Sequence, residues 1–414
     1  MLFMLLIIPC LSLGQTLDES IAHAIKNAPT IEQTKHITSA AEWQFNANIG
    51  ALTPTVNLSS NDNKTRSHII RRATQNRSVS ITQPIFSLAL LPNIQQSNLA
   101  LSNTKISQKQ AEQSVILDVC TTYLNALSTL NHISLRKQNM QTIRTEIKKV
   151  TAELNAGTKT KRDLQFARAE LSTNQAALVE AKALLRNQIL KLQVLTNQDL
   201  TNLYTLAKSP RTGMLPSKPE TLAIAQIAAV KQAHNNAIIQ DKEYGKSLAG
   251  IAPTIALTAK HTRSFDSAEK NTVSLNISLP LSATKTADSL KNRQLAKASY
   301  QAWKSEKQSA ILRQTELMNQ YDVHKALLLA RLEKLEERSQ FFYTQKRSLE
   351  NDIITTEKYL EALENKTAAQ LETEQTFFDA WLNHFSALAF RHELSVAAVK
   401  PLTALLAKKS EIKP

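Results

Sequence analysis

Two segments of the chain alternate strictly between apolar and polar residues. Residues 272–279 read Thr-Val-Ser-Leu-Asn-Ile-Ser-Leu, and residues 77–82 follow the same design nearly two hundred positions earlier. Successive side chains of a strand point to opposite faces, so this period of two predicts strands with one apolar and one polar face. The apolar positions are Val79, Ile81, Val273, Leu275, Ile277 and Leu279.

A partner strand precedes each alternating segment. Pro54-Thr-Val-Asn-Leu stands before the first, and Pro253-Thr-Ile-Ala-Leu stands before the second. Each alternating strand ends in a proline, Pro84 or Pro280. The sequence therefore predicts two β-hairpins, over residues 52–86 and 252–281, in an internally duplicated chain.

Outside the hairpins the apolar residues recur every three or four positions, as on one face of a helix. Residues 88–156 contain a single proline and no glycine, and residues 283–351 contain neither. Each segment predicts one helix of about 70 residues, about 105 Å long. Shorter return helices are predicted over 158–197 and 355–388, the first with a seven-residue coiled-coil repeat of Leu164, Leu171, Leu178, Leu185 and Leu192.

These elements define two structural repeats, over residues 15–200 and 219–390. Each has the order helix, hairpin, long helix and return helix, and the second is predicted to begin with a helix from residue 219 to residue 248. A helix before a hairpin, stacked end to end on a return helix, matches one long helix in length. Residues 201–218 link the repeats and residues 391–414 form a C-terminal tail, and both are expected to pack as a belt around the helices.

Composition narrows the class of protein. With 6 glycines and 12 prolines in 414 residues, the chain favours few, long elements. Mean hydropathy is −0.27, and the one long apolar run, residues 1–13, is too short to cross a bilayer as a helix. We interpret residues 1–14 as a signal peptide, with lipidation at Cys10 left open.

The net charge of +15 raises the question of an anionic partner. The 35 acidic residues are mixed through the same helices, which argues against nucleic acid. Basic residues gather only in the loop of the first hairpin, where we single out Arg71, Arg72 and Arg77. This loop is expected to lie at the cell surface, and either contacts lipopolysaccharide phosphates or is merely solvated.

The sequence contains no recognisable catalytic, cofactor or metal constellation, and we do not expect an enzyme. The nine histidines are scattered, and His132 and His324 lack a ligand-type neighbour at the right spacing. Cys120 falls on an apolar helical stripe and is expected in a core.

The hairpins suggest a membrane barrel, because strands can cross lipid only in a closed barrel. Strands of about 10 residues suit that role, and the apolar positions would face lipid while the intervening serines, threonines and asparagines face water. Four strands cannot close, whereas two copies give eight and three give twelve. The alternative is an adaptor-like, periplasmic or cytosolic structural coiled-coil protein with incidental hairpins.

Residues 154–169 resemble the tip signature of the TolC-type outer-membrane channel family. In that signature a glycine is followed six residues later by aspartate and ten later by alanine, here Gly157, Asp163 and Ala167. Residues 17–31 and the run Gln83-Pro-Ile-Phe also look like the family. The resemblance implies a mainly α protein with β, forming a homotrimer with a 12-strand outer-membrane barrel continued by a 12-helix periplasmic barrel.

The resemblance also implies a function and partners. Such channels passively conduct substrates for a tripartite efflux pump or a type I secretion system. They dock on a periplasmic adaptor and an inner-membrane transporter. The exported substrate cannot be read from the sequence.

The second tip departs from this pattern. Asp352 stands where glycine is expected and Lys358 where aspartate is expected. Aspartate tolerates the left-handed conformation of such a turn. By resemblance the tips form the periplasmic constriction, where Lys358 either pairs with Glu361, pairs with Asp163 of a neighbouring hairpin, or points to solvent.

Overall fold

The computed structural model describes residues 16–66, 71–198, 202–205, 210–264, 267–279, 283–406 and 408–411. The predicted signal peptide, Cys10 and Pro280 lie outside these ranges. The chain divides into two compact units. One comprises Met1–Ile31, Gln110–Leu222 and Leu312–Pro414, and the other comprises Glu32–Lys109 and Ala223–Ile311. The fold is mainly helical, with one antiparallel four-stranded sheet.

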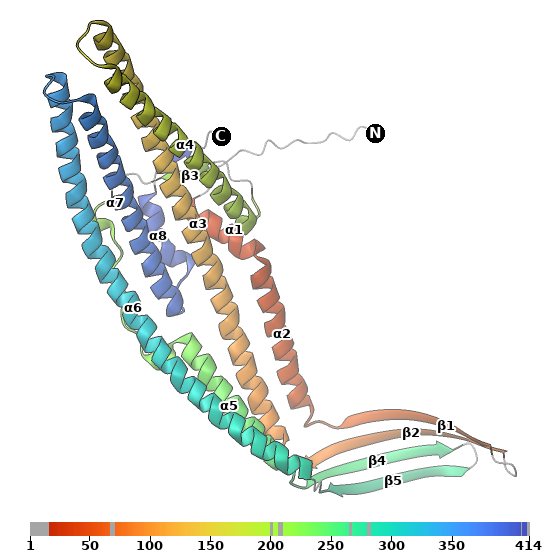
Figure 1. The fold of residues 1–414 in the computed structure, drawn as a ribbon. Coiled ribbons are helices and arrows are strands. Elements are labelled where there is room, and N and C mark those ends of the chain that lie inside the picture. Colours follow the sequence, from red (N-terminus) through yellow and green to blue (C-terminus); the bar gives the residue numbers. More distant parts are fainter. Residues whose placement is uncertain are drawn as a thin grey trace, which may run out of the picture. The chain divides into compact units, whose positions relative to one another are not determined.

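The two predicted hairpins join into a single sheet (Figure 1). The strands are β1 (Thr55–Arg66), β2 (Arg71–Phe86), β4 (Thr254–Ser264) and β5 (Ser267–Ser278), and their order is β1-β2-β4-β5. The pairing of β2 with β4 shifts register between Pro84 and Phe86, where proline has no N–H to give to the ladder. The strand order makes β1 and β5 the outer strands of the sheet.

Four helices belong to the same unit and meet the strands at one end of the sheet (Figure 1). They are α2 (Pro29–Gly50), α5 (Ala228–Ala249), and the portions of α3 (Leu90–Asn155) and α6 (Ala283–Glu350) that follow β2 and β5. Lys285 of α6 donates to the carbonyl of Gly250, 2.9 Å away, and ties the start of α6 to the end of α5.

The other unit is built from α1 (Leu17–Asn27), α4 (Lys161–Thr196), α7 (Thr356–Phe390), α8 (Val396–Leu405) and the remaining parts of α3 and α6. α1 begins with a capping box in which Thr16 and Glu19 exchange hydrogen bonds of 2.8 and 3.2 Å. The core contains Cys120, as expected, and its burial raises the pKa of the thiol. The largest fully buried rings are Tyr123, Phe377, Phe378 and Phe385.

The heptad leucines of α4 lie on its inner face. Leu185 and Leu192 are buried, and Leu164, Leu171 and Leu178 are partly buried. α4 runs beside α7, so this stripe packs within the helical unit as the seven-residue spacing predicts.

The helix predicted to begin at residue 219 is wrong at its start. α5 begins at Ala228, after a 3₁₀ turn at Ile224–Gln226. Tyr321 donates to the carbonyl of Pro216 at 2.7 Å, and Lys218 pairs with Asp322 at 2.5 Å. These contacts hold the preceding segment against α6, and Pro219 disfavours helical backbone at Lys218.

The linker and the tail contact each other and the helical unit. β3 (Asn202–Thr205), from the linker, pairs antiparallel with β6 (Lys408–Glu411), from the tail. α8 lies against α1, where Thr403 donates to Asp18 Oδ1 at 2.5 Å. Residues 396–406 and 408–411 thus belong to this unit.

Candidate tip and strand sites

The turns that end α3 and α6 have the same backbone design. Gly157 has φ 81° and Asp352 has φ 55°, both left-handed. In the first turn the N–H of Gly157 donates to the carbonyl of Leu154, and the N–H of Thr158 donates to the carbonyl of Glu153. In the second turn Asp352 donates to Leu349 in the same way, and Ile353 donates to Ser348. This pair of bonds is the Schellman motif, so aspartate takes the place that glycine usually holds.

Both return helices have a threonine N-cap, but only α4 has the complete capping box. Thr160 caps α4 and Thr355 caps α7, and each side chain accepts from the N–H three residues on. Asp163 returns the bond, since its Oδ2 accepts from the Thr160 N–H at 3.1 Å and the hydroxyl at 2.7 Å. These bonds lower the pKa of Asp163. Lys358 stands at the equivalent place in α7 and carries no acceptor.

Two ion pairs connect the tips across the helical unit. Lys159 Nζ lies 3.2 Å from Asp352 Oδ1, and Arg162 Nη2 lies 3.6 Å from Glu357 Oε2. Lys159 keeps only 15% of its side chain exposed, whereas Asp352 keeps 74%. Sequence reasoning missed both pairs, because it offers no signal for which loop residues of two separate hairpins meet.

Lys358 and Glu361 are both exposed, one turn apart on α7. In the described part of this single chain neither forms an ion pair, and Asp163 is engaged by its own cap. Lys358 is exposed in this single chain, and the three arrangements expected for it, a pairing with the Asp163 of another copy among them, stay predictions.

Below the tips lies a small aromatic core. Phe342 of α6 stacks on Tyr359 of α7 with ring centroids 5.6 Å apart, and Lys366 lies 4.7 Å above the Phe342 ring. Burial, reinforced by the charges of Glu146 and Glu350, raises the pKa of Tyr359 to about 12. Ala167 of the family signature is fully buried in the same cluster, which explains why a small residue suits the position.

A polar network in the middle of the helical unit was not predicted. Arg136 of α3 donates to Glu364 of α7 at 2.6 Å and to Asn174 of α4 at 3.0 Å, so one guanidinium joins three helices. His132 accepts from Arg136 Nε at 3.0 Å, and burial lowers the pKa of its imidazole. His132 thus has the packing role that its sequence context favoured.

A second buried group is Glu374 of α7. Asn131 of α3 donates to its carboxyl, and only 7% of the residue is exposed. Burial raises its pKa to about 7. The sequence signal was weak: a carboxylate within an otherwise apolar helical stripe.

The sheet has one apolar and one polar face. Val56, Ile81, Ala259 and Val273 lie opposite one another on successive strands and so share a face. The large apolar side chains of this face are 40% to 79% exposed: Val56, Leu58, Val79, Ile81, Leu257, Val273, Leu275 and Ile277. Leu279, just past β5, is 55% exposed.

The opposite face holds hydrogen-bonded polar side chains. Ser59 and Ser78 hydroxyls lie 2.7 Å apart, and Thr82 and Thr258 hydroxyls lie 3.2 Å apart. Asn276 Nδ2 also donates to Thr258, at 3.1 Å. The alternation read from the sequence thus becomes two continuous surfaces of opposite polarity.

The basic loop lies partly outside the described residues. Nothing is described of the side chains of Arg71 and Arg72, whereas Arg77 is exposed and lies opposite Arg263 in the sheet register. Arg263 in turn lies 3.4 Å from Glu269.

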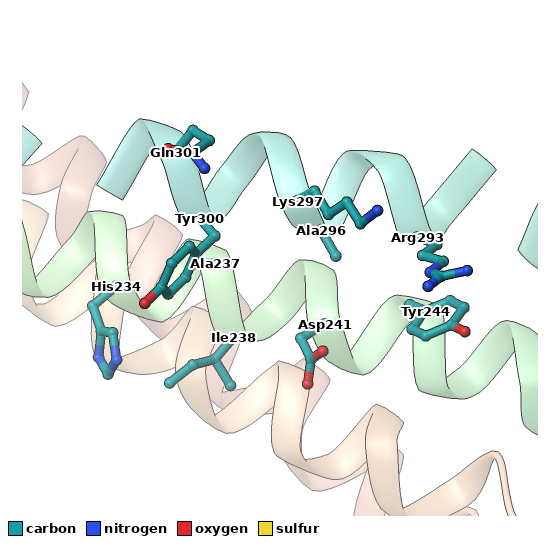
Figure 2. Close-up of a pocket in the computed structure, with 10 residues that line it drawn as sticks. All are labelled: His234, Ala237, Ile238, Asp241, Tyr244, Arg293, Ala296, Lys297, Tyr300 and Gln301. Carbon is teal, nitrogen blue, oxygen red and sulfur yellow. The ribbon is translucent and has the colours of Figure 1, made fainter. Parts of the chain in front are cut away.

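A groove of about 490 Å³ lies between α5 and α6 (Figure 2). Arg293 extends over the ring of Tyr244 at one end, and His234 and Tyr300 flank the other. No three or more His, Cys, Asp or Glu side chains in the described ranges are placed to hold a metal ion. Among the described helices, none is both long and apolar enough to cross a membrane.

Comparison with known proteins gives this architecture its context. The family described as Outer membrane efflux protein matches residues 21–198. The Campylobacter jejuni CmeC outer membrane channel superposes with a TM-score of 0.81, covering 94% of this chain and 90% of that one at 14% identity. The chain has the fold of the outer-membrane channel proteins.

Further relatives agree with this assignment. VceC of Vibrio cholerae gives a TM-score of 0.78 at 12% identity, covering 91% of this chain and 96% of that one. Outer membrane protein TolC of Escherichia coli K12 is 24% identical over 191 residues, which is 44% of this chain but only 38% of TolC. The family match and the fold confirm the TolC-type resemblance.

Proposed function

We propose that the protein is the outer-membrane channel of an export system and works as a homotrimer. The observation that carries this proposal is the four-stranded sheet, whose faces differ in polarity and whose outer strands, β1 and β5, pair only inward in the described chain. Exposed outer strands need partners. Three copies, joined β5 to β1, supply the twelve strands of a water-filled barrel.

The polarity of the two faces gives the barrel its orientation. The exposed face of Val56, Leu58, Val273, Leu275 and Ile277 suits hydrocarbon, with Val79, Ile81 and Leu279 completing the lipid-facing set. The face with Thr82, Thr258 and Asn276 lines the water-filled interior, where a charged residue such as Lys260 stays hydrated.

The helical unit would continue this channel into the periplasm. Substrates pass through passively, supplied by an inner-membrane transporter and a periplasmic adaptor in a tripartite efflux pump or a type I secretion system. The tips at Gly157, Asp163, Asp352, Lys358 and Glu361 form the periplasmic entrance and the adaptor contact. The ion pair of Lys159 with Asp352 supports a closed arrangement of each copy's two tips.

The basic residues of the first hairpin are assigned to lipid contact. Arg71, Arg72 and Arg77 would meet lipopolysaccharide phosphates, because a guanidinium can donate two parallel hydrogen bonds to a phosphate. The position of Arg77 supports this, because on β2 it lies nearer to the loop than Val79 and Ile81, the lipid-facing residues of that strand.

The test combines mass with conductance. The detergent-purified protein should have the mass of three chains and should form stepwise, long-lived conductances in a planar lipid bilayer. A monomeric protein without conductance would favour the alternative, an adaptor-like structural coiled-coil protein.

A further inference from the structure

The groove between α5 and α6 is bounded at each end by large side chains. At one end Arg293 of α6 extends over the ring of Tyr244 of α5 (Figure 2). The other end has Tyr300 of α6 and His234 of α5, whose rings lie 5.2 and 4.7 Å from the Trp303 ring. Arg293 and Tyr300 are seven residues apart, so the two ends are separated by about 10 Å along α6. The groove is therefore a compartment of limited length.

Small side chains line the middle of this compartment. Ala237 of α5 and Ala296 of α6 lie between the two ends, beside Ile238. Each alanine extends a single methyl group from its helix, so space remains between the helices that larger side chains would fill. The volume of about 490 Å³ is within the range of sites for small organic molecules. One flat molecule of two fused rings fits this length and volume.

Three charged side chains line the compartment without pairing with one another. Arg293 and Lys297 belong to α6 and Asp241 to α5, and all three are exposed. Within the described ranges none of them takes part in an ion pair. Two cations and one carboxylate give the lining an excess of positive charge, which attracts an anion.

The charges next to the compartment do not cancel this excess. Lys304 adds a further cation at one end, where its Nζ lies 5.0 Å from the centre of the Tyr300 ring. Glu243 of α5 is engaged on another side of its helix, since its Oε2 accepts from Gln96 of α3 at 2.9 Å and lies 3.5 Å from Lys246 Nζ. The compartment therefore combines aromatic rings, a small-residue floor and unpaired cations.

We propose that this compartment binds a flat aromatic carboxylate. The ring system lies on Ala237 and Ala296 between the two tyrosine rings, which offer stacked or edge-on contacts to it. The carboxylate accepts from Arg293, because a guanidinium can donate two parallel hydrogen bonds to a carboxylate. Lys297 adds a second positive charge. Every contact comes from α5 and α6 of one copy, so the site does not depend on the proposed homotrimer.

Asp241 restricts the ligand to one negative charge. A monocarboxylate neutralises the excess positive charge, whereas the second carboxylate of a dianion meets the Asp241 side chain of like charge. Asp241→Asn should therefore improve the binding of 2,6-naphthalenedicarboxylate more than that of 2-naphthoate. An equal change for both acids would show that Asp241 does not select by charge.

Fluorine NMR of a small probe tests the site in the detergent-purified, full-length protein. The line width of 6-fluoro-2-naphthoate should increase on binding and should saturate. Arg293→Gln should weaken the affinity about tenfold or more, the usual effect of losing a charge-assisted hydrogen bond. Ala296→Leu should abolish binding, because leucine fills the middle of the compartment. The neutral 6-fluoro-2-naphthalenemethanol should bind more weakly and should not distinguish Arg293→Gln from the parent.

Lys291→Gln is the matched control. Lys291 is exposed, does not line the groove, and lies about 200° around α6 from Arg293, since the two are two residues apart. This variant removes one positive charge from the same helix and should leave the affinity for the probe unchanged.

The comparison of exposed positions decides the outcome, because replacing either Arg293 or Lys291 disturbs no buried contact. Equal broadening in the parent, Arg293→Gln and Ala296→Leu would mean that the probe enters detergent or an adventitious surface, and would overturn the site. Equal weakening by Arg293→Gln and Lys291→Gln would overturn it too, by reducing the effect to overall charge. Neither result changes the conductance of the parent, so the channel proposal is tested separately.

Discussion

Lys159 Nζ lies 3.2 Å from Asp352 Oδ1, and this ion pair joins the turn after α3 to the turn after α6. Asp352 also holds the left-handed position of its turn, with φ 55°. One residue thus shapes the second tip and attaches it to the first. Glycine, at the same place in the first tip, can do only the former.

Replacing Asp352 with glycine should separate these two roles. The turn should persist, because glycine adopts positive φ freely, while the ion pair is lost. Since Asp352 is largely exposed, unfolding stability should change by roughly 0–1 kcal/mol. In bilayer recordings the open probability should rise, and Lys159→Gln should reproduce the effect. Unchanged gating in both variants would show that the pair does not hold the tips.

Lys358→Asp should complete the capping box of α7. The new carboxylate can accept from the Thr355 N–H, as Asp163 does from Thr160 in α4. We expect a stability gain of about 0.5–1 kcal/mol, measured by thermal unfolding. Lys358→Asn is the control, because asparagine is polar but carries no charge.

Substitutions at Lys358 and Glu361 also test whether these side chains set the ion selectivity of the pore. If Lys358 and Glu361 line the entrance, Lys358→Asp should raise cation selectivity and Glu361→Ala should lower it, read from reversal potentials in a salt gradient. Parent-like selectivity in both variants would place these side chains outside the conducting path.

Glu374 should make stability depend on pH. Burial raises its folded-state pKa to about 7 from the ordinary value of 4.5, so the folded protein favours the neutral acid. Its stabilising contribution is full below pH 4.5 and is lost as the pH rises through about 7. The loss should approach roughly 2–3 kcal/mol. Glu374→Gln should remove this slope in denaturant titrations at pH 5 and pH 8, and a retained slope would assign it to another group.

The basic loop should matter only where phosphate is present. Changing Arg71, Arg72 and Arg77 together to glutamine should lower the melting temperature of the trimer in lipopolysaccharide, with little change in neutral detergent. Arg263→Gln is a useful comparison, because Arg263 already has Glu269 nearby. Equal effects in both media would mean that the loop is simply solvated.

Local patterns predicted the elements well, because each depends on neighbours in sequence. The period of two placed the strands, and the left-handed turn at Asp352 followed from residue chemistry. The start of α5 was misplaced, because the segment just before the predicted start is held against α6 by Tyr321 and Asp322, about a hundred positions away. Only contacts in space reveal such a competition.

For the candidate sites too, local features were predicted from the sequence and contacts between distant residues were not. The two faces of the sheet were visible in the alternation, but the pairing of β2 with β4 was not, since nothing local joins strands separated by the whole first repeat. The links of Arg136 to Glu364 and of Lys159 to Asp352 were equally hidden. Each joins residues whose own helices would form without the other.

The central claim is that the sheet is part of a water-filled barrel in lipid, and labelling of β5 tests it most directly. Single cysteines at Ser274 and Leu275, in Cys10→Ala protein reconstituted into liposomes, would be treated with a membrane-impermeant maleimide. Ser274→Cys should react because it lies on the polar face with Thr258, and Leu275→Cys should be shielded by lipid until detergent replaces the bilayer. Equal reaction at both positions in liposomes would contradict the barrel.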